Sequence, residues 1–220
     1  MPRETGTWTI LSVKIRSFTD LMFANRFTAL IDANVLASAP KRDLVLTLAR
    51  AEMFRFRWTD RILDETRSAM TGMFIQRDFE EAEAVQRATS SIDAMKAAFP
   101  ESMIEGDFTD VPDYPGIADL KDNHVLHAAI RCQASMLVTD NIKDFPTEAL
   151  EPYSVEIATA DNFIADAIDL DRYRAAEAIK VLRSRLTNPP MSAAELLDLW
   201  ETRHGLTETV SLLRPFQGLI

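Results

Sequence analysis

The chain has 220 residues, of which 47% are hydrophobic and 26% charged, a composition typical of globular proteins and far from that of disordered chains. Its formal net charge of −10 argues against a large nucleic-acid footprint, which would show as a basic stripe, unless the acids are gathered to hold divalent cations. The single cysteine, Cys132, excludes an intrachain disulfide and predicts a reducing, cytoplasmic setting.

The first segment, residues 1–25, carries basic residues but no continuous apolar stretch of the kind found in secretory signals. No run in the chain approaches the ~18 apolar residues that cross a bilayer, so we expect no membrane association. Met22 stands just before the first convincing strand. We therefore interpret residues 1–25 as an N-terminal extension outside the folded domain.

The first predicted strand lies in the apolar stretch RFTALIDANVLASAP, residues 26–40. Asp32 stands in the middle of this stretch, and an isolated buried carboxylate is costly unless something neutralises it. Helical spacing of apolar residues follows at 41–53, and alternation predicts a strand over 54–59. A helix is expected over 60–70, with an interruption at Gly72.

A long amphipathic helix is predicted over 74–99, and prolines predict a loop over 100–121 with a short strand at 102–106. A helix over 122–134 and strands over 135–140 and 153–160 follow. Strands that alternate with helices indicate a parallel sheet covered on both faces. We expect an α/β fold, a three-layer α/β/α sandwich over residues 26–160, followed by a C-terminal helical module over 161–220.

Four acids are predicted to gather at one end of this sheet. Ligands bind beyond the carboxyl ends of parallel strands, where Asp32 and Asp140 both lie. Asp122 and Glu65 fall three or four residues from core-facing residues of their helices, on the same face. Clustered carboxylates repel one another unless a cation lies among them, and such ligands suit Mg²⁺ or Mn²⁺. Two such ions about 4 Å apart could support phosphodiester cleavage.

Each acid except Asp32 also has a simpler interpretation. Asp122, or Asp119 in its place, could cap a helix, which is the commonest use of an aspartate there. Glu65 could be a solvated helix residue, and Asp140 could belong to a turn. Asp32 is harder to explain in this way, because the strand around it has no exposed surface.

Other candidate sites carry weaker signals. His124 and His127 are three residues apart on a helix but have no partner at zinc spacing, so we interpret them as ordinary helix residues. Cys132 is expected to be packed. The sequence contains no glycine-rich phosphate loop and no nucleophile-elbow motif.

The stretches FTALIDANVL, WTDRILDET, DNHVLHAAI and MLVTDNIKDF resemble, in their order and spacing, the PIN domain family, the nuclease fold of VapC-type toxins. The resemblance covers residues 26 to about 160, and the helical tail looks like the extension found in one branch of PIN proteins. It implies a Mg²⁺- or Mn²⁺-dependent endoribonuclease that cleaves RNA, the toxin of a type II toxin–antitoxin pair. A small antitoxin would block the site, and family members commonly form homodimers.

Carried over residue by residue, the resemblance implies three acids as metal ligands: Asp32, Glu65 and Asp122, with Asp119 as a competitor of Asp122. The fourth acid would be Asp140, with Asn141 and Asp144 as alternatives at the equivalent place. Asn34 and Thr139 would orient ligands or waters beside the metal.

The acidic balance departs from the family, whose RNA contacts usually need basic residues near the acidic rim. Seven basic residues flank the motifs and could form a local patch: Arg26, Arg55, Arg57, Arg61, Arg67, Lys121 and Lys143. Arginines at alternating strand positions also fit a solvated face. Two rival hypotheses are a non-catalytic binding module with a structural cation or none, and a phosphatase or DNA flap nuclease. The sequence contains no long helical arch that could thread a DNA flap, which argues against the flap nuclease.

Overall fold

The computed structural model describes residues 27–106, 108 and 110–220, so the predicted extension over 1–25 and Arg26 lie outside the described residues. Its centre is a sheet of four parallel strands in the order β2–β1–β3–β4. The strands are β1 (Thr28–Ile31), β2 (Arg55–Arg57), β3 (Met136–Val138) and β4 (Glu156–Ala158). The predicted parallel sheet is therefore confirmed, although its strands are shorter than expected.

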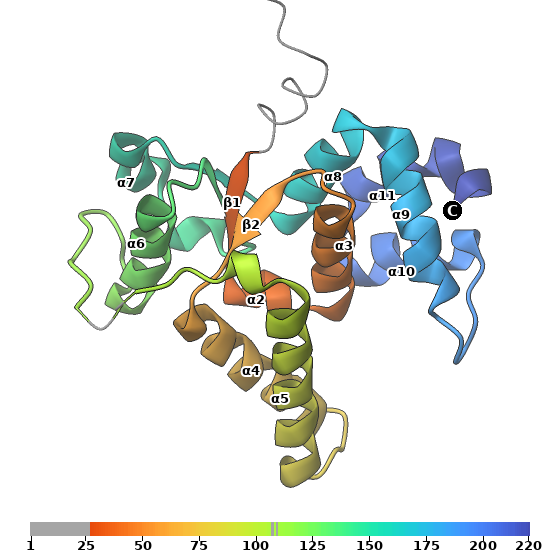
Figure 1. Ribbon diagram of the computed structural model, residues 1–220, viewed down its shortest axis with the longest axis horizontal. Helices are drawn as coiled ribbons and strands as arrows, with labels where there is room; N and C mark the ends of the chain where they lie inside the picture. The colour runs from red at the N-terminus through yellow and green to blue at the C-terminus, as the bar shows by residue number, and fades with distance from the viewer. Residues whose placement is uncertain (1–26, 107, 109) are drawn as a thin grey trace, which may run out of the picture.

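Helices cover both faces of the sheet, which confirms the predicted α/β sandwich. In Figure 1, α6 (Asn123–Arg131) and α7 (Thr147–Leu150) lie on one side of β1, and α3 (Ala39–Arg50) and α8 (Ala160–Leu170) lie on the other. The short helix α2 (Ala33–Ala37) follows β1 directly. The helices α4 (Asp60–Ile75) and α5 (Glu81–Ala98) form a hairpin that projects from the sheet (Figure 1).

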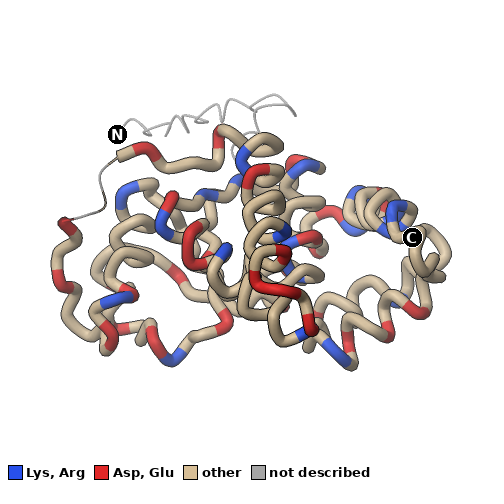
Figure 2. The backbone as a smooth tube through the Cα atoms, turned by 90° about the horizontal axis from the view of Figure 1, so that it is seen from below, with Lys and Arg blue, Asp and Glu red and all other residues tan. Residues whose placement is uncertain are grey.

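The C-terminal region consists of helices: α9 (Arg172–Ser184), α10 (Ala193–His204) and α11 (Thr207–Leu213), followed by the 3₁₀ segment Arg214–Leu219. None of the described helices combines the length and the apolar character that crossing a membrane requires. Acidic and basic residues are interspersed over the sheet region and the helical region alike (Figure 2).

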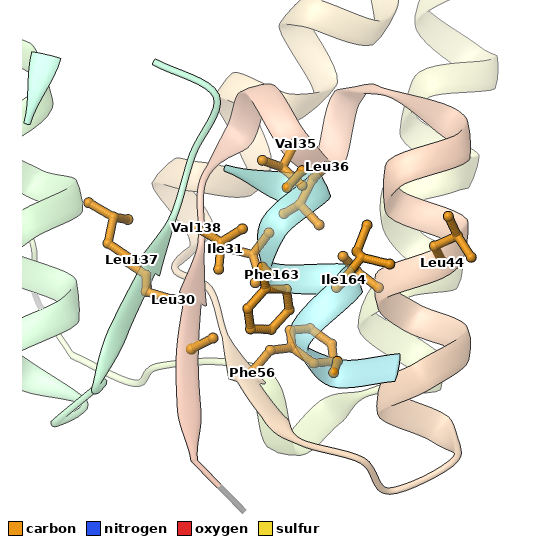
Figure 3. Close-up of a cluster of buried hydrophobic side chains, with 14 of the residues drawn as sticks. Leu30, Ile31, Val35, Leu36, Leu44, Phe56, Leu137, Val138, Phe163 and Ile164 are labelled. Carbon is orange, nitrogen blue, oxygen red and sulfur yellow. The ribbon is translucent and has the colours of Figure 1, made fainter. Parts of the chain in front are cut away.

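The core is continuous between the sheet and the C-terminal helices. Leu30 pairs with Leu137 and Ile31 with Val138 across β1 and β3, and successive residues point to opposite faces of the sheet (Figure 3). Phe163 of α8 is fully buried and joins the same apolar cluster as the strand residues. The helical region is therefore anchored on the sheet through α8, and the division near residue 160 stays a prediction.

Two predicted boundaries are wrong. The first strand ends at Ile31 and does not extend through the whole of FTALIDANVL, because Asp32, at the end of the strand as predicted, accepts a hydrogen bond from the backbone N–H of Ala33 and starts α2. Gly72 does not interrupt its helix, since a glycine inside a helix costs only ~1 kcal/mol. The break comes instead after Ile75, where Asp78 adopts a left-handed φ of 64°. The strand predicted at 102–106 is reduced to a parallel bridge between Trp58 and Met103.

Candidate active site

Asp32 lies at the carboxyl end of β1 and is only 8% exposed. One carboxylate oxygen accepts a 2.6 Å hydrogen bond from the backbone N–H of Ala33. The other accepts 2.7 Å hydrogen bonds from the Thr139 hydroxyl and from the Asn34 side-chain amide. Both oxygens are thus held in place by neighbours from α2 and from the end of β3.

Thr139 links the ends of the two central strands. Its side chain is fully buried, and its hydroxyl oxygen accepts hydrogen bonds from Asn34 Nδ2 at 2.8 Å and from the Asn141 N–H at 3.1 Å. The Asn34 side-chain oxygen in turn accepts from the N–H of Asp140 at 3.1 Å. The structure therefore brings the predicted residues Asn34 and Thr139 against Asp32, while Asn141 contributes its backbone.

Glu65 reaches the same region from α4 and is paired with two cationic or potentially cationic groups. His124 Nε2 lies 3.0 Å and Arg61 Nε 3.3 Å from its Oε1. Burial raises the pKa of Glu65, but the hydrogen bonds and charges of His124 and Arg61 outweigh this and lower it. Glu65 is therefore held in its ionised form.

His124 was missed by the sequence reasoning, which treated it as an ordinary helix residue. It is 2% exposed, contacts Glu65 through Nε2, and its Nδ1 has no hydrogen-bond partner among the described residues. The available signal was its place two residues after Asp122, at the start of α6. His127, by contrast, lies within 2.6 Å of the Tyr114 hydroxyl through Nδ1 and has no contact with the acids.

The structure separates the roles of Asp119 and Asp122. Asp119 accepts a 2.9 Å hydrogen bond from the N–H of Lys121 and caps the 3₁₀ segment Leu120–Asp122. Asp122 stands at the N-cap of α6 without making a capping hydrogen bond. The capping function thus falls to Asp119, which leaves the carboxylate of Asp122 available to a ligand.

Burial and the charges of neighbouring acids disfavour the ionised forms of Asp32 and Asp122. Burial raises the pKa of Asp32, and the negative charge of Glu65 adds to this, against the hydrogen bonds from Thr139 and Ala33. The pKa of Asp122 is raised by burial and then by the charges of three acids: Asp119, Asp144 and Asp32. Acids from separate elements therefore lie within electrostatic reach of one another.

Asp140, the predicted fourth acid, forms an ion pair and a hydrogen bond with residues outside the acidic group. One oxygen lies 2.7 Å from Lys41 Nζ, and the other accepts a 3.1 Å hydrogen bond from the N–H of Ala160 at the start of α8. Asp144, on the 3₁₀ segment Ile142–Asp144, instead raises the pKa of Asp122 through its charge. The geometry thus favours Asp144, the alternative drawn from the sequence, over Asp140 as the fourth acid.

The donor set fits a hard divalent cation. Among residues 27–106, 108 and 110–220, no three His, Cys, Asp or Glu side chains form a ready-made metal cluster. Mg²⁺ commonly binds through one or two carboxylates and keeps several waters, so three preassembled ligands are not required. Asp32 and Asp122 provide two such carboxylates, and a cation between them would favour the ionised forms, which burial and neighbouring acids disfavour.

Comparisons with known proteins agree with this geometry. Residues 28–143 match the PIN domain family, and residues 160–215 match the VapC50 C-terminal domain. A protein from Mycobacterium tuberculosis (strain H37Rv) named "Putative ribonuclease VapC50" is 38% identical over 78 residues. That alignment covers 36% of this chain and 46% of the relative, so it spans about half of the relative's length. No solved structure matches the chain. The predicted resemblance is confirmed for the sheet region and for the helical tail.

Proposed function

The chain belongs to the PIN domain family, and from this premise we propose that it is a divalent-metal-dependent endoribonuclease, the toxin of a type II toxin–antitoxin pair. Its relative is named as a ribonuclease, and the C-terminal helices match a domain of the same named protein. The proposal includes Mg²⁺ or Mn²⁺ as the cofactor, RNA as the substrate, a small antitoxin as the partner, a homodimer as the assembly and the cytoplasm as the location.

The observation that supports the proposal is that acids from distant parts of the chain lie within electrostatic reach of one another. Asp32 follows β1, Glu65 lies on α4, Asp122 precedes α6, and Asp144 follows β3. Their charges act on one another at the carboxyl end of a parallel sheet, where ligands of such folds bind. A hydrolytic site for a phosphodiester needs such a set of oxygen ligands to position a divalent cation.

Each residue has a distinct proposed role. Asp32 and Asp122 would hold the cation, and Asn34 and Thr139 would keep the Asp32 carboxylate oriented. A bound Mg²⁺ or Mn²⁺ lowers the pKa of its water and stabilises negative charge on the phosphate. Glu65, kept ionised by His124 and Arg61, would accept a proton from the attacking water.

The test is cleavage of single-stranded RNA by the purified protein in Mn²⁺, comparing the parent with Asp32→Asn. This substitution keeps the shape of the side chain but removes its charge. We expect the cleavage rate to fall at least a hundredfold, because even residues that only support a metal ligand are worth roughly 10–100-fold. Asp166→Asn, which alters an exposed acid on α8, is the matched control and should cleave like the parent.

Three outcomes would contradict the proposal. Equal cleavage by the parent and Asp32→Asn would mean that the activity comes from elsewhere. A parent protein that neither binds Mn²⁺ in calorimetric titration nor cleaves RNA would favour the non-catalytic binding module. Cleavage of a DNA flap or a phosphomonoester in preference to RNA, in a panel of substrates, would favour the phosphatase or flap-nuclease hypothesis.

A further inference from the structure

A pocket lies where the C-terminal helices meet the sheet region. Its volume is about 230 Å³, and it is walled by the segment between α2 and α3, by the end of α4 and by the last residue of α10. Three of its lining residues carry basic groups: Arg42, Arg77 and His204. In contrast to the acidic balance of the chain, no Asp or Glu lines it.

Further positive charge surrounds this pocket. Burial lowers the pKa of His204, and the positive charges of Lys41, Arg77 and Arg203 lower it further, so these three side chains act on the same ring. Arg77 and Arg203 are exposed, and neither forms an ion pair within the described part of the chain. Two further cations at the pocket are paired: Arg42 with Asp43 at 3.7 Å and Lys41 with Asp140 at 2.7 Å. We call the four cations Lys41, Arg42, Arg77 and Arg203, together with His204, whose lowered pKa favours its neutral form, the cationic pocket.

The remaining wall of the cationic pocket is apolar. Met70, Met73 and Phe74 line it, and Met73 is 39% exposed. The cavity is smaller than the ~300–1,000 Å³ of most small-molecule pockets, so it suits one nucleotide unit rather than a large ligand. Single-stranded nucleic acids are bound by this combination, in which cations contact the phosphates and apolar or aromatic side chains contact the bases.

The cationic pocket is connected to the acidic site. Lys41 Nζ lies 2.7 Å from the carboxylate of Asp140, which follows Thr139, the residue that donates to Asp32. Helix α2 begins after Asp32 and ends at the pocket wall, at Ala37 and Ser38. The five residues of α2 span about 7.5 Å, a distance of only a few phosphates on a nucleic-acid strand.

We propose that the cationic pocket binds the backbone phosphates of the RNA strand beside the site of cleavage, so that the C-terminal helices contribute directly to substrate binding through Arg203 and His204. This inference rests on the proposed ribonuclease function and names where its substrate runs. It is separate from the local basic patch that the sequence left open beside a solvated face; two residues of that patch are paired, Arg61 with Glu65 and Arg67 with Asp64.

The test is binding of a fluorescently labelled 20-nucleotide oligoadenylate, followed by anisotropy over a range of salt concentrations in EDTA. The variants are Arg77→Glu and Arg203→Glu, at exposed positions where a charge reversal leaves the core intact. The control is Lys180→Glu, which makes the same change of charge at an exposed position on α9 outside the pocket. Circular dichroism confirms that all three variants are folded.

We expect each pocket variant to bind the oligoadenylate about three- to tenfold more weakly than the parent. The slope of log affinity against log salt should become shallower by about 0.7 for each phosphate of the single strand that a variant no longer neutralises. Arg77→Lys should keep most of the affinity, and Lys180→Glu should bind within twofold of the parent. Pocket variants that bind like Lys180→Glu, with an unchanged slope, would overturn the proposal.

Binding in EDTA does not depend on cleavage, so the two proposals fail separately. If the parent cleaves RNA and both pocket variants keep full affinity for RNA, the ribonuclease function stands and the proposed RNA site is wrong. If the parent does not cleave RNA but both pocket variants bind RNA more weakly than the parent, the RNA site stands and the ribonuclease function is wrong. If polyglutamate binding depends on Arg77 and Arg203 while RNA binding does not, the pocket takes an acidic peptide and the proposal is wrong.

Discussion

The hydroxyl of Thr139 donates a 2.7 Å hydrogen bond to the carboxylate of Asp32, across 107 residues of sequence. It joins the ends of the two central strands where the acids gather. The same hydroxyl oxygen accepts from Asn34 and from the backbone of Asn141, so one small side chain fixes several neighbours.

Replacing this hydroxyl tests how much it contributes. Thr139→Val keeps the shape of the side chain but removes the donor to Asp32 and the acceptor for Asn34. We expect a loss of about 1–3 kcal/mol in the free energy of unfolding, measured with urea, because buried partners are left unsatisfied. Thr139→Ser retains the hydroxyl and should lose less. Equal stability of the Val variant and the parent would mean that the network does not hold the site together.

Substitutions of Asp140 and Asp144 are expected to change different properties, stability in the first case and Mn²⁺ affinity in the second. Asp144→Asn removes a charge that acts on Asp122, and should weaken Mn²⁺ binding several-fold in calorimetric titration without a large change in stability. Asp140→Asn removes the ion pair with Lys41 and weakens the hydrogen bond that residue 140 accepts from the N–H of Ala160. It should lower stability by about 1 kcal/mol and leave Mn²⁺ affinity nearly unchanged. The reverse pattern would restore Asp140 as the fourth acid.

The sequence predicted the parallel sheet and the alternation of strands and helices along the chain, because buried strands are local signals. It also suggested, from a carboxylate inside an apolar run, that Asp32, Glu65 and Asp122 share one site, which stays a prediction. It could not decide between Asp140 and Asp144. That choice depends on Lys41, which is distant in sequence and neutralises the first of them. The role of His124 was missed for the same reason, since only the fold places it against Glu65.

The C-terminal helices are tied to the sheet region by Asp161. Its carboxylate accepts 2.9 Å hydrogen bonds from the N–H groups of Glu208 and Thr209, and so caps α11 from α8. Asp161→Ala should cost about 1–2 kcal/mol of unfolding free energy, as for the loss of a helix cap. Asp166→Ala, at an exposed position on the same helix, is the control. A loss no larger than that of Asp166→Ala would show that the cap is unimportant.

The contact between His124 and Glu65 should affect the rate of cleavage more than substrate binding. His124→Leu removes the group 3.0 Å from the Glu65 carboxylate and leaves it positioned by Arg61 alone. We expect kcat to fall about tenfold or more with little change in KM, because the position of a general base affects the transition state and not substrate binding. His124→Gln, which can still donate to Glu65, should recover part of the loss. A change in KM alone would assign His124 to binding.

Asp32 should make stability depend on pH in a way that Asp32→Asn removes. Its pKa is raised in the folded protein above the usual 3.8, mainly by burial, so the folded state binds more protons than the unfolded state between the two values. Metal-free stability attributable to Asp32 therefore falls as pH rises through this window. The unfolding free energy of the parent, minus that of Asp32→Asn, should decrease as pH rises above about 4 in urea titrations with EDTA.

Mn²⁺ should reverse this trend, because it binds the deprotonated carboxylate and stabilises only the folded state. At a metal concentration about 100 times Kd the gain is about 2.7 kcal/mol, and it should appear as pH rises and protons no longer compete. Asp32→Asn should show a much smaller gain at every pH, and Asp166→Asn should behave like the parent. A pH-independent difference between the parent and Asp32→Asn in EDTA, or an equal Mn²⁺ gain in both, would contradict the assignment of Asp32 as a buried metal ligand.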